Sequence, residues 1–249
     1  MAKTSISKNP RRRTRLYTTQ NRATSKGSVT AEYIKAIMLA VGLALFIRTF
    51  FFQAFRLPSG SMEDTLLVGD FLLANKFIYG AKIPFTSARL PALRDPQPND
   101  IVIFEYPEDP SRDFIKRIVA GPGQTVEVRD KILYINNKRA IDPARSKYID
   151  PHIFKKPTSL RDNFGPEVVP EGHFFVMGDN RDNSEDSRYW GFLDGNRIHG
   201  QAFLLYWSWA PDEQAPEYHT LSSIPRWLFY NILHIPQRTR WGRIGMMVE

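Results

Sequence analysis

A serine within Pro58-Ser59-Gly60-Ser61-Met62 is the first residue that could do chemistry. Pro, Ser and Gly are typical turn residues, so composition alone predicts a turn here. A turn of this kind can also present a nucleophile, with Gly60 letting the backbone approach a substrate and Ser61 attacking it. No Gly-x-Ser-x-Gly elbow is present in the sequence, so the pattern does not indicate an α/β-hydrolase.

A serine nucleophile needs a base, and a predicted strand at Phe114–Val119 offers one candidate. Alternation along a strand places Lys116 on one face with Phe114 and Ile118. Apolar neighbours would desolvate its ammonium group and lower its pKa, as a general-base lysine requires. The alternation itself does not choose between Lys116 and its neighbour Arg117, but arginine cannot give up its proton in a protein. The alternative is an ordinary exposed lysine.

A third polar segment, at residues 178–191, reads Gly-Asp-Asn-Arg-Asp-Asn-Ser-Glu-Asp-Ser-Arg-Tyr-Trp-Gly. An EF-hand calcium loop is excluded, because a register starting at Asp179 puts Ser184 where Gly is required and Trp190 where Glu is required. Arg181 and Arg188, interleaved with the acids, indicate internal ion pairs. Burying so many short polar side chains in a connection is costly unless they are paired, so the segment favours a functional site over a plain loop.

Composition limits the other kinds of chemistry. The 249 residues contain no cysteine, which excludes disulfides, thiolate metal sites and a cysteine nucleophile. The five histidines lack the spacing of a zincin site, and we expect no metal and no cofactor. Hydrophobic residues make up 42% of the chain, which excludes a disordered protein.

The net charge of +8 belongs to the start of the chain. Residues 1–30 carry eight Lys and Arg and no acid, and the remainder is neutral by formal count. We therefore expect no nucleic-acid partner. The tail, which we predict to be disordered, precedes a predicted transmembrane anchor at residues 31–55. The positive-inside rule places the tail in the cytoplasm and the rest of the chain outside.

The anchor prediction depends on the flanks of a short apolar core. The uninterrupted apolar stretch, Ala36–Ile47, has 12 residues, fewer than the roughly 20 that span a bilayer. Lys35 and Arg48 can extend their charged ends towards the two interfaces, which lengthens the usable segment. A buried core helix and a cleaved signal peptide are the alternatives, and no small-x-small cleavage site follows to support the second.

Strands must position the candidate catalytic residues, since the sequence pattern after residue 57 changes from helical to β. The body at residues 56–249 is predicted to be mostly antiparallel β, with Thr125–Val128 and Ile132–Ile135 forming a hairpin. We expect a core at about 56–135 and 171–215, an inserted subdomain at about 136–170 and a C-terminal segment at 216–249. That last segment is predicted to be a final core element or an interfacial one. The other predicted strands are 101–106, 114–119, 173–177 and 202–209.

The motifs in their order resemble bacterial type I signal peptidase (leader peptidase), over roughly residues 30–210. This resemblance implies a membrane-anchored Ser/Lys-dyad serine endopeptidase of mostly β fold. Its antiparallel β-sheet catalytic core carries a small second β subdomain and follows one N-terminal transmembrane helix. The family often has Pro where Asp64 stands and Asp where Gln124 stands. The matching segments are Pro-Ser-Gly-Ser-Met-Glu-Asp-Thr-Leu at 58–66, Gly-Asp-Phe-Leu-Leu-Ala-Asn-Lys at 69–76, Phe-Ile-Lys-Arg-Ile-Val-Ala-Gly-Pro-Gly at 114–123 and the polar segment at 178–191.

The resemblance also implies a role for each matching residue. Ser61 would be the nucleophile and Lys116 the general base, with Ser184 orienting Lys116. The Ser59 hydroxyl and the Ser61 backbone N–H would hold the oxyanion. Asp186 and Arg188 would pair to support the site. The remaining implied residues are Asp179, Asn180 and Arg181, which would shape the loop, and Met62 and Phe114, which would flank the substrate pocket.

The implied substrates are signal peptides of exported preproteins, cut after small-x-small (Ala-x-Ala) sequences. The implied partners are the lipid bilayer and the secretion translocon. The implied location is the bacterial cytoplasmic (inner) membrane, crossed once, with the catalytic domain on the periplasmic or extracytoplasmic side. A self-cleaving repressor-like Ser/Lys protein is one alternative, although the basic tail offers no DNA-binding domain. A non-catalytic membrane-tethered binding protein is the other.

Overall fold

A computed structural model describes residues 26–84, 86, 88–156, 158–216 and 220–248. The chain divides into two compact units, residues 1–43 and residues 44–249. Most of the basic tail predicted at residues 1–30 lies outside the described residues.

Helix α1 runs from Lys26 to Phe50 and confirms the predicted N-terminal apolar helix. Within it, Val29–Phe50 has 22 residues with a mean hydropathy of 1.7. At about 1.5 Å per residue this segment is roughly 33 Å long, close to the thickness of a bilayer's hydrocarbon core. The anchor was predicted to end at residue 55, but the helix ends at Phe50. The reason is that the aromatic-rich stretch beginning at Phe52 pairs as a strand.

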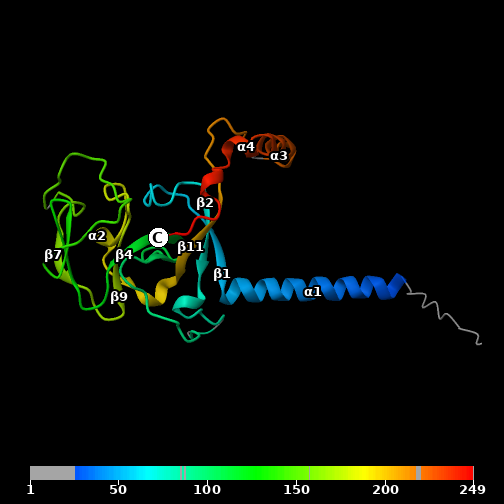
Figure 1. Cartoon of the computed structure of the whole chain (residues 1–249), viewed down its shortest axis with the longest axis horizontal. Coiled ribbons are helices and arrows are strands. Elements are labelled where there is room, and N and C mark those ends of the chain that lie inside the picture. The colour runs from blue at the N-terminus through cyan, green and yellow to red at the C-terminus, as the bar shows by residue number, and fades with distance from the viewer. Residues whose placement is uncertain (1–25, 85, 87, 157, 217–219, 249) are drawn as a thin grey trace, which may run out of the picture. The chain divides into compact units, whose positions relative to one another are not determined.

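Seven strands form one antiparallel sheet in the order β1-β2-β11-β3-β4-β9-β10, drawn in Figure 1. Strand β11, the last in the chain, lies between β2 and β3. It therefore joins the C-terminal part of the body to the N-terminal part in one sheet. The strands are β1 (Phe52–Arg56), β2 (Asp70–Asn75), β3 (Ile101–Glu105), β4 (Asp113–Ala120), β9 (His173–Met177), β10 (Leu193–Asp194) and β11 (Ile198–Ser208).

Strand β3 is buried on both faces, which explains its continuous apolar sequence. Ile101 and Ile103 pack into one core cluster, whereas Val102 and Phe104 pack into another. The neighbouring strand β4 lies in register beside it and carries the candidate base, with Lys116 opposite Val102. The two apolar layers therefore fix the strand that positions Lys116.

A second, four-stranded sheet has the order β7-β6-β5-β8. Strands β5 and β6 form the predicted hairpin, and both turn residues, Asp130 and Lys131, have positive φ, as a two-residue hairpin turn of type I′ requires. The sequence pattern assigns residues up to about 135 to the core, whereas β5 pairs with β8 in the second sheet rather than with a strand of the large sheet. The sequence pattern identifies the hairpin but not its non-local partner. The strands are β5 (Thr125–Arg129), β6 (Ile132–Ile135), β7 (Lys138–Arg139) and β8 (Phe164–Val168).

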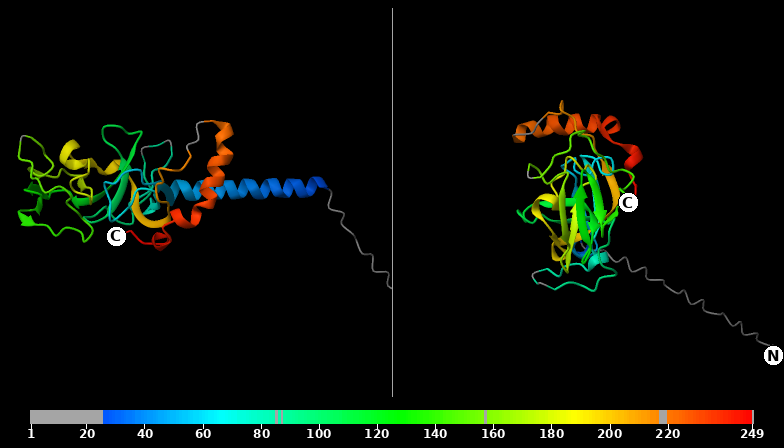
Figure 2. Two further views of the ribbon diagram at one scale, coloured as in Figure 1. Left: turned by 90° about the horizontal axis from the view of Figure 1, so that it is seen from above. Right: turned by 90° about the vertical axis from the view of Figure 1, so that its left-hand side faces the viewer.

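Short helices complete the body, and α3 and α4 lie outside both sheets (Figure 2). Hydrogen bonds from Ala210 to Arg238 and from Arg240 to Ser208 connect the chain after α4 to the end of β11. The helices are η1 (Phe77–Tyr79), α2 (Ser187–Trp190), η2 (Gly195–Arg197), η3 (Leu221–Ser223), α3 (Ile224–Leu233), α4 (Ile235–Arg238) and η4 (Trp241–Arg243).

Gly69 is a point where two backbones meet closely. Its N–H donates to the carbonyl of Leu57, and its own carbonyl accepts from the N–H of Trp209. Its φ is +89°, and a Cβ at this position would overlap the carbonyl oxygen of Trp209. Glycine at this position therefore lets the segment leading from β1 to Ser61 dock beside the end of β11.

We expect Gly69→Ala to destabilise the body more than a matched change at Gly123, which also has positive φ but no heavy atom within 4 Å of a built Cβ. Gly123→Ala should cost about 1–2 kcal/mol from backbone strain alone. Gly69→Ala should cost a further ~2 kcal/mol or more, because a backbone atom must move. Denaturant unfolding of both variants measures this, and equal losses would mean that the close approach is unimportant.

Candidate active site

Ser61 begins a compact turn that follows the end of β1. The N–H of Glu63 donates to the carbonyl of Gly60, and the N–H groups of Thr65 and Leu66 donate to the carbonyl of Met62. The carbonyl of Ser61 itself accepts from the N–H of Asn180, 3.0 Å away. The turn is therefore fixed internally and is tied to the polar segment at residues 178–191.

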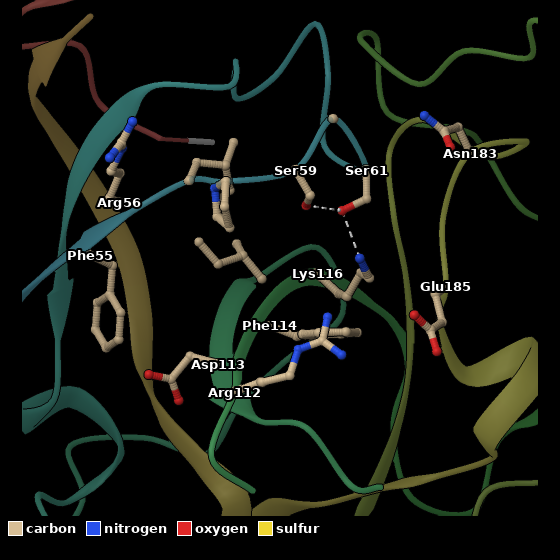
Figure 3. A pocket seen from close by; sticks show the side chains of 14 residues that line it. Phe55, Arg56, Ser59, Ser61, Arg112, Asp113, Phe114, Lys116, Asn183 and Glu185 are labelled. Atoms are coloured by element: carbon tan, nitrogen blue, oxygen red, sulfur yellow. Dashed lines mark hydrogen bonds between the residues drawn. The ribbon is translucent and has the colours of Figure 1, made fainter. Parts of the chain in front are cut away.

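The Nζ atom of Lys116 lies 2.7 Å from the Oγ atom of Ser61, and both side chains are buried. The two residues are 55 positions apart in the sequence, and β4 brings them together. Phe114 and Ile118 pack in the same core cluster, which agrees with the face predicted for Lys116. The Phe114 ring also lies 5.2 Å from Nζ. Figure 3 shows the contact at the centre of the pocket.

Burial lowers the pKa of Lys116 from its ordinary value near 10.5 to about 8. The carboxylates of Asp186, Glu185 and Asp179 act in the opposite direction, and Arg188 adds to the lowering. At neutral pH roughly one molecule in ten therefore carries Lys116 as the free amine, which can accept a proton. No carboxylate forms a salt bridge with Lys116 within the described residues.

Two groups are expected to hold the oxyanion, the Ser59 hydroxyl and the backbone N–H of Ser61 itself. The Ser59 hydroxyl is 3.4 Å from the Ser61 Oγ atom. The backbone N–H of Ser61 donates no hydrogen bond to any residue that the structure describes. Two donors next to one nucleophile can stabilise a developing negative charge.

A buried ion pair supports the Ser61 turn from the other side of β4. Asp179 accepts hydrogen bonds from both Nε and Nη2 of Arg117, at 2.9 and 2.8 Å. It also accepts from the Thr65 hydroxyl at 2.6 Å. The next residue, Asn180, donates from its side chain to the carbonyl of Gly60. Asp179 and Asn180 thus connect β4 to the turn, and sequence reasoning missed Arg117 and Thr65 as its partners.

Asp186 and Arg188 form a second buried pair, joined by two hydrogen bonds of 2.8 Å. Arg188 also donates to the carbonyl groups of Arg161 and Arg181. Burial alone would raise the pKa of Asp186, but the charge and hydrogen bonds of Arg188 hold it below its ordinary value. The two opposite charges of this pair compensate each other, and the hydrogen bonds of Arg188 hold the polar segment together.

Ser184 differs from the sequence expectation. Its Oγ atom is buried and has no hydrogen-bond partner among the described residues, so the predicted bond to Lys116 is not made here. Gly178 packs against it, because a Cβ on Gly178 would overlap the Ser184 hydroxyl and come within 2.5 Å of the Ser61 carbonyl. Ser184 therefore lies close to the Ser61 turn without a hydrogen bond to the lysine.

Two further residues lie away from the pocket. Met62 is fully buried in the core with Leu57 and Leu66, because the turn after Ser61 directs it inward. Arg181 donates to Asp142 at 2.6 Å and to the Tyr148 hydroxyl, so it holds the loop that connects β7 to β8 in the second sheet. Sequence spacing could not separate these roles, since neighbouring residues of a turn point in different directions.

The pocket at the dyad has a volume of about 430 Å³ and includes residues that sequence reasoning did not single out. Tyr106 stacks on Phe114 at 4.2 Å, and its hydroxyl donates to Glu185 at 2.6 Å. Figure 3 shows Glu185 and Asn183 on one side of the dyad and Phe55 and Arg56 on the other. The lining residues are Phe55 to Ser61, Arg112 to Lys116, Asn183 and Glu185.

Comparison with known proteins decides the family. Residues 30–207 match the model of the family described as signal peptidase, peptidase S26. The chain belongs to this family. It is 34% identical to signal peptidase I of Pseudomonas aeruginosa over 84% of this chain and 81% of that protein. It is 33% identical to signal peptidase I of Aquifex aeolicus, covering 85% and 97% of the two chains, and 36% identical to signal peptidase I T of Bacillus subtilis, covering 76% and 91%.

As a member of the signal peptidase family, the chain is a serine peptidase and a hydrolase. A buried amine in contact with a serine hydroxyl has the geometry of a nucleophile paired with its base. Among the described residues no group of three or more His, Asp or Glu side chains could hold a metal ion. The contact between Lys116 Nζ and Ser61 Oγ allows proton transfer and nucleophilic attack at this site.

We expect Glu185→Gln to lower the pKa of Lys116 further, because it removes a carboxylate that favours the ammonium form. A pH titration followed by NMR of ¹⁵N-labelled lysine side chains measures this, with Lys116→Met identifying the signal. Glu108→Gln is the matched control, since Glu108 also accepts from the Tyr106 hydroxyl but does not line the pocket. An equal shift in both variants would contradict a direct electrostatic effect of Glu185.

Proposed function

We propose that this peptidase removes N-terminal signal peptides from exported preproteins, with Ser61 as nucleophile and Lys116 as general base. The observation that carries the proposal is the 2.7 Å contact between Lys116 Nζ and Ser61 Oγ. The relatives named signal peptidase I, which align over most of their own length, support the substrate class.

The proposed reaction begins with the neutral form of Lys116. Its amine accepts the proton of the Ser61 hydroxyl as the oxygen attacks the carbonyl carbon of the scissile bond. The tetrahedral intermediate collapses when the ammonium returns this proton to the leaving amine, which leaves an ester on Ser61. A water molecule, deprotonated by the same amine, then attacks the ester. The bond between the acyl carbon and Ser61 Oγ breaks, the ammonium returns the proton to Oγ, and the signal peptide leaves with a free carboxylate.

The backbone N–H of Ser61 and the hydroxyl of Ser59 are the proposed donors to the oxyanion. Their positions beside Ser61 support this role. The Ser59 side chain is more exposed than Ser61 and sits on the pocket wall, where a substrate carbonyl can reach it. Removing one such donor typically lowers kcat by about 10²–10³.

We propose cleavage after small-x-small sequences such as Ala-x-Ala. The bulky side chains of Phe55, Phe114 and Ile115 line a pocket of modest volume, which supports selection of small residues. The self-cleaving and non-catalytic alternatives receive no support from these contacts.

We propose that α1 is a single-pass anchor in the bacterial cytoplasmic membrane, with the N-terminus in the cytoplasm and the catalytic body outside. The length and hydropathy of Val29–Phe50 support a span, and the eight basic residues before it support the orientation. The bilayer is then a direct partner, and the secretion translocon is a proposed one because it delivers the substrate.

We expect Ser61→Ala and Lys116→Ala each to reduce cleavage of a preprotein by at least about 10³-fold, since members of a nucleophile–base pair act as a unit. The assay is release of the mature protein, followed by gel electrophoresis and by mass spectrometry of the new N-terminus. Lys138→Ala, at an exposed position of β7, is the control and should cleave normally. Substantial activity in either dyad variant would refute the assignment.

We expect kcat/KM to rise with pH through about 8 and then level off, because the free amine of Lys116 is the active form. The sign follows from the lowered pKa: below it the ammonium dominates, and each unit of acidification should remove roughly nine-tenths of the activity. Initial rates on a peptide containing Ala-x-Ala, from about pH 6 to 9, measure the profile. A flat profile is incompatible with a lysine base.

A further inference from the structure

Helix α3 turns an apolar face towards solvent. Leu228, Phe229, Ile232 and Leu233 are 46%, 67%, 61% and 55% exposed, and their spacing places them on one side of the helix. Leu221, just before the helix, is 87% exposed. An apolar stripe of this size on a helix surface is unusual in a soluble protein and marks a contact surface.

The opposite side of α3 is polar or aromatic and faces the body. The Tyr230 hydroxyl donates to Asp212 at 2.9 Å, and the Asn231 side chain accepts from Arg238 at 2.6 Å. The His234 ring stacks on Tyr230. A helix that packs onto a soluble domain normally has the reverse arrangement, with its apolar side inward. The polar contacts thus fix α3 to the body with its apolar side outward.

The charge of the surrounding segment favours one kind of partner. Residues 220–248 contain four arginines, of which Arg238 pairs with Asp212, and Arg240 and Arg243 pair with Asp70. Arg226, in the first turn of α3, is exposed beside the apolar face. A short amphipathic helix with exposed Leu, Ile and Phe, an exposed cation in its first turn and no Asp or Glu in its own sequence matches a helix that lies in the interface of an anionic bilayer.

We propose that α3 inserts its apolar face into the boundary between headgroups and acyl chains of an anionic membrane. The body then has a lipid contact of its own in addition to α1. This inference deepens the membrane location given under the proposed function and rests on it. With α3 in the interface, the body would be held at the bilayer, and the pocket would meet a signal peptide at a defined depth relative to the membrane.

The test uses the full chain in proteoliposomes of phosphatidylcholine and phosphatidylglycerol. Because the sequence has no cysteine, Phe229→Cys carries a single bimane label. Nitroxide-labelled lipids should quench its fluorescence by about half or more, as expected for a side chain at the acyl boundary. The same label at Ile141→Cys, a 96% exposed position between β7 and β8, is the solvent control and should remain unquenched.

A label at Leu39→Cys in α1 separates the two proposals. Quenching at Leu39 but not at Phe229 would overturn the α3 contact alone, and no quenching at Leu39 would overturn the anchor and the inference with it.

Self-quenching at Phe229 that disappears when labelled protein is diluted with unlabelled protein would instead indicate a second copy on this face. In a Phe229→Asp/Ile232→Asp background, a label at Leu233→Cys should lose its lipid quenching, while circular dichroism stays unchanged because both positions are exposed.

Discussion

The body of this peptidase is arranged around one buried lysine, Lys116, which forms no salt bridge with any carboxylate in the part of the chain that the structure describes. An ammonium group in such a place is destabilised, so burial lowers the pKa of Lys116, and its Nζ atom forms a hydrogen bond with the Ser61 hydroxyl. This state requires apolar packing on both sides of β3 and β4, with the nearest carboxylates kept out of direct contact. The clusters around Ile103 and Phe104 provide that packing.

The charges that surround the lysine are neutralised by one another. Asp179 is occupied by Arg117 and Thr65, and Asp186 is occupied by Arg188. If either arginine were lost, a buried carboxylate would be left unpaired, and it would stabilise the ammonium form of Lys116. The two ion pairs thus act on the dyad through electrostatics as well as through the position of the polar segment. Glu185, which is exposed and held by Tyr106, is the one carboxylate of this group at the pocket wall.

The sequence predicted the parts of the site whose chemistry is restrictive. A serine in a Gly-containing turn, and a lysine alternating with Phe114 and Ile118, were visible from residue type and period, and so was the apolar helix. Sequence could not predict contacts that depend on which strand pairs with which. The hairpin at Thr125–Ile135 was recognised, but its place in the second sheet follows from pairing with β8, about 30 residues further on. Similarly, Met62 and Ser184 belong to matching motifs, yet the direction of each side chain is set by local turns and packing.

The proposed dyad joins residues from distant parts of the chain, and this determines when during synthesis the site can form. Ser61 follows β1, Lys116 lies in β4, and the Ser61 carbonyl is held by Asn180 after β9. A chain that has emerged only as far as β4 contains both dyad residues but lacks the segment that orders them. The site can therefore become ordered only after residue 180 has been synthesised, and its sheet is complete only with β11, which lies between β2 and β3.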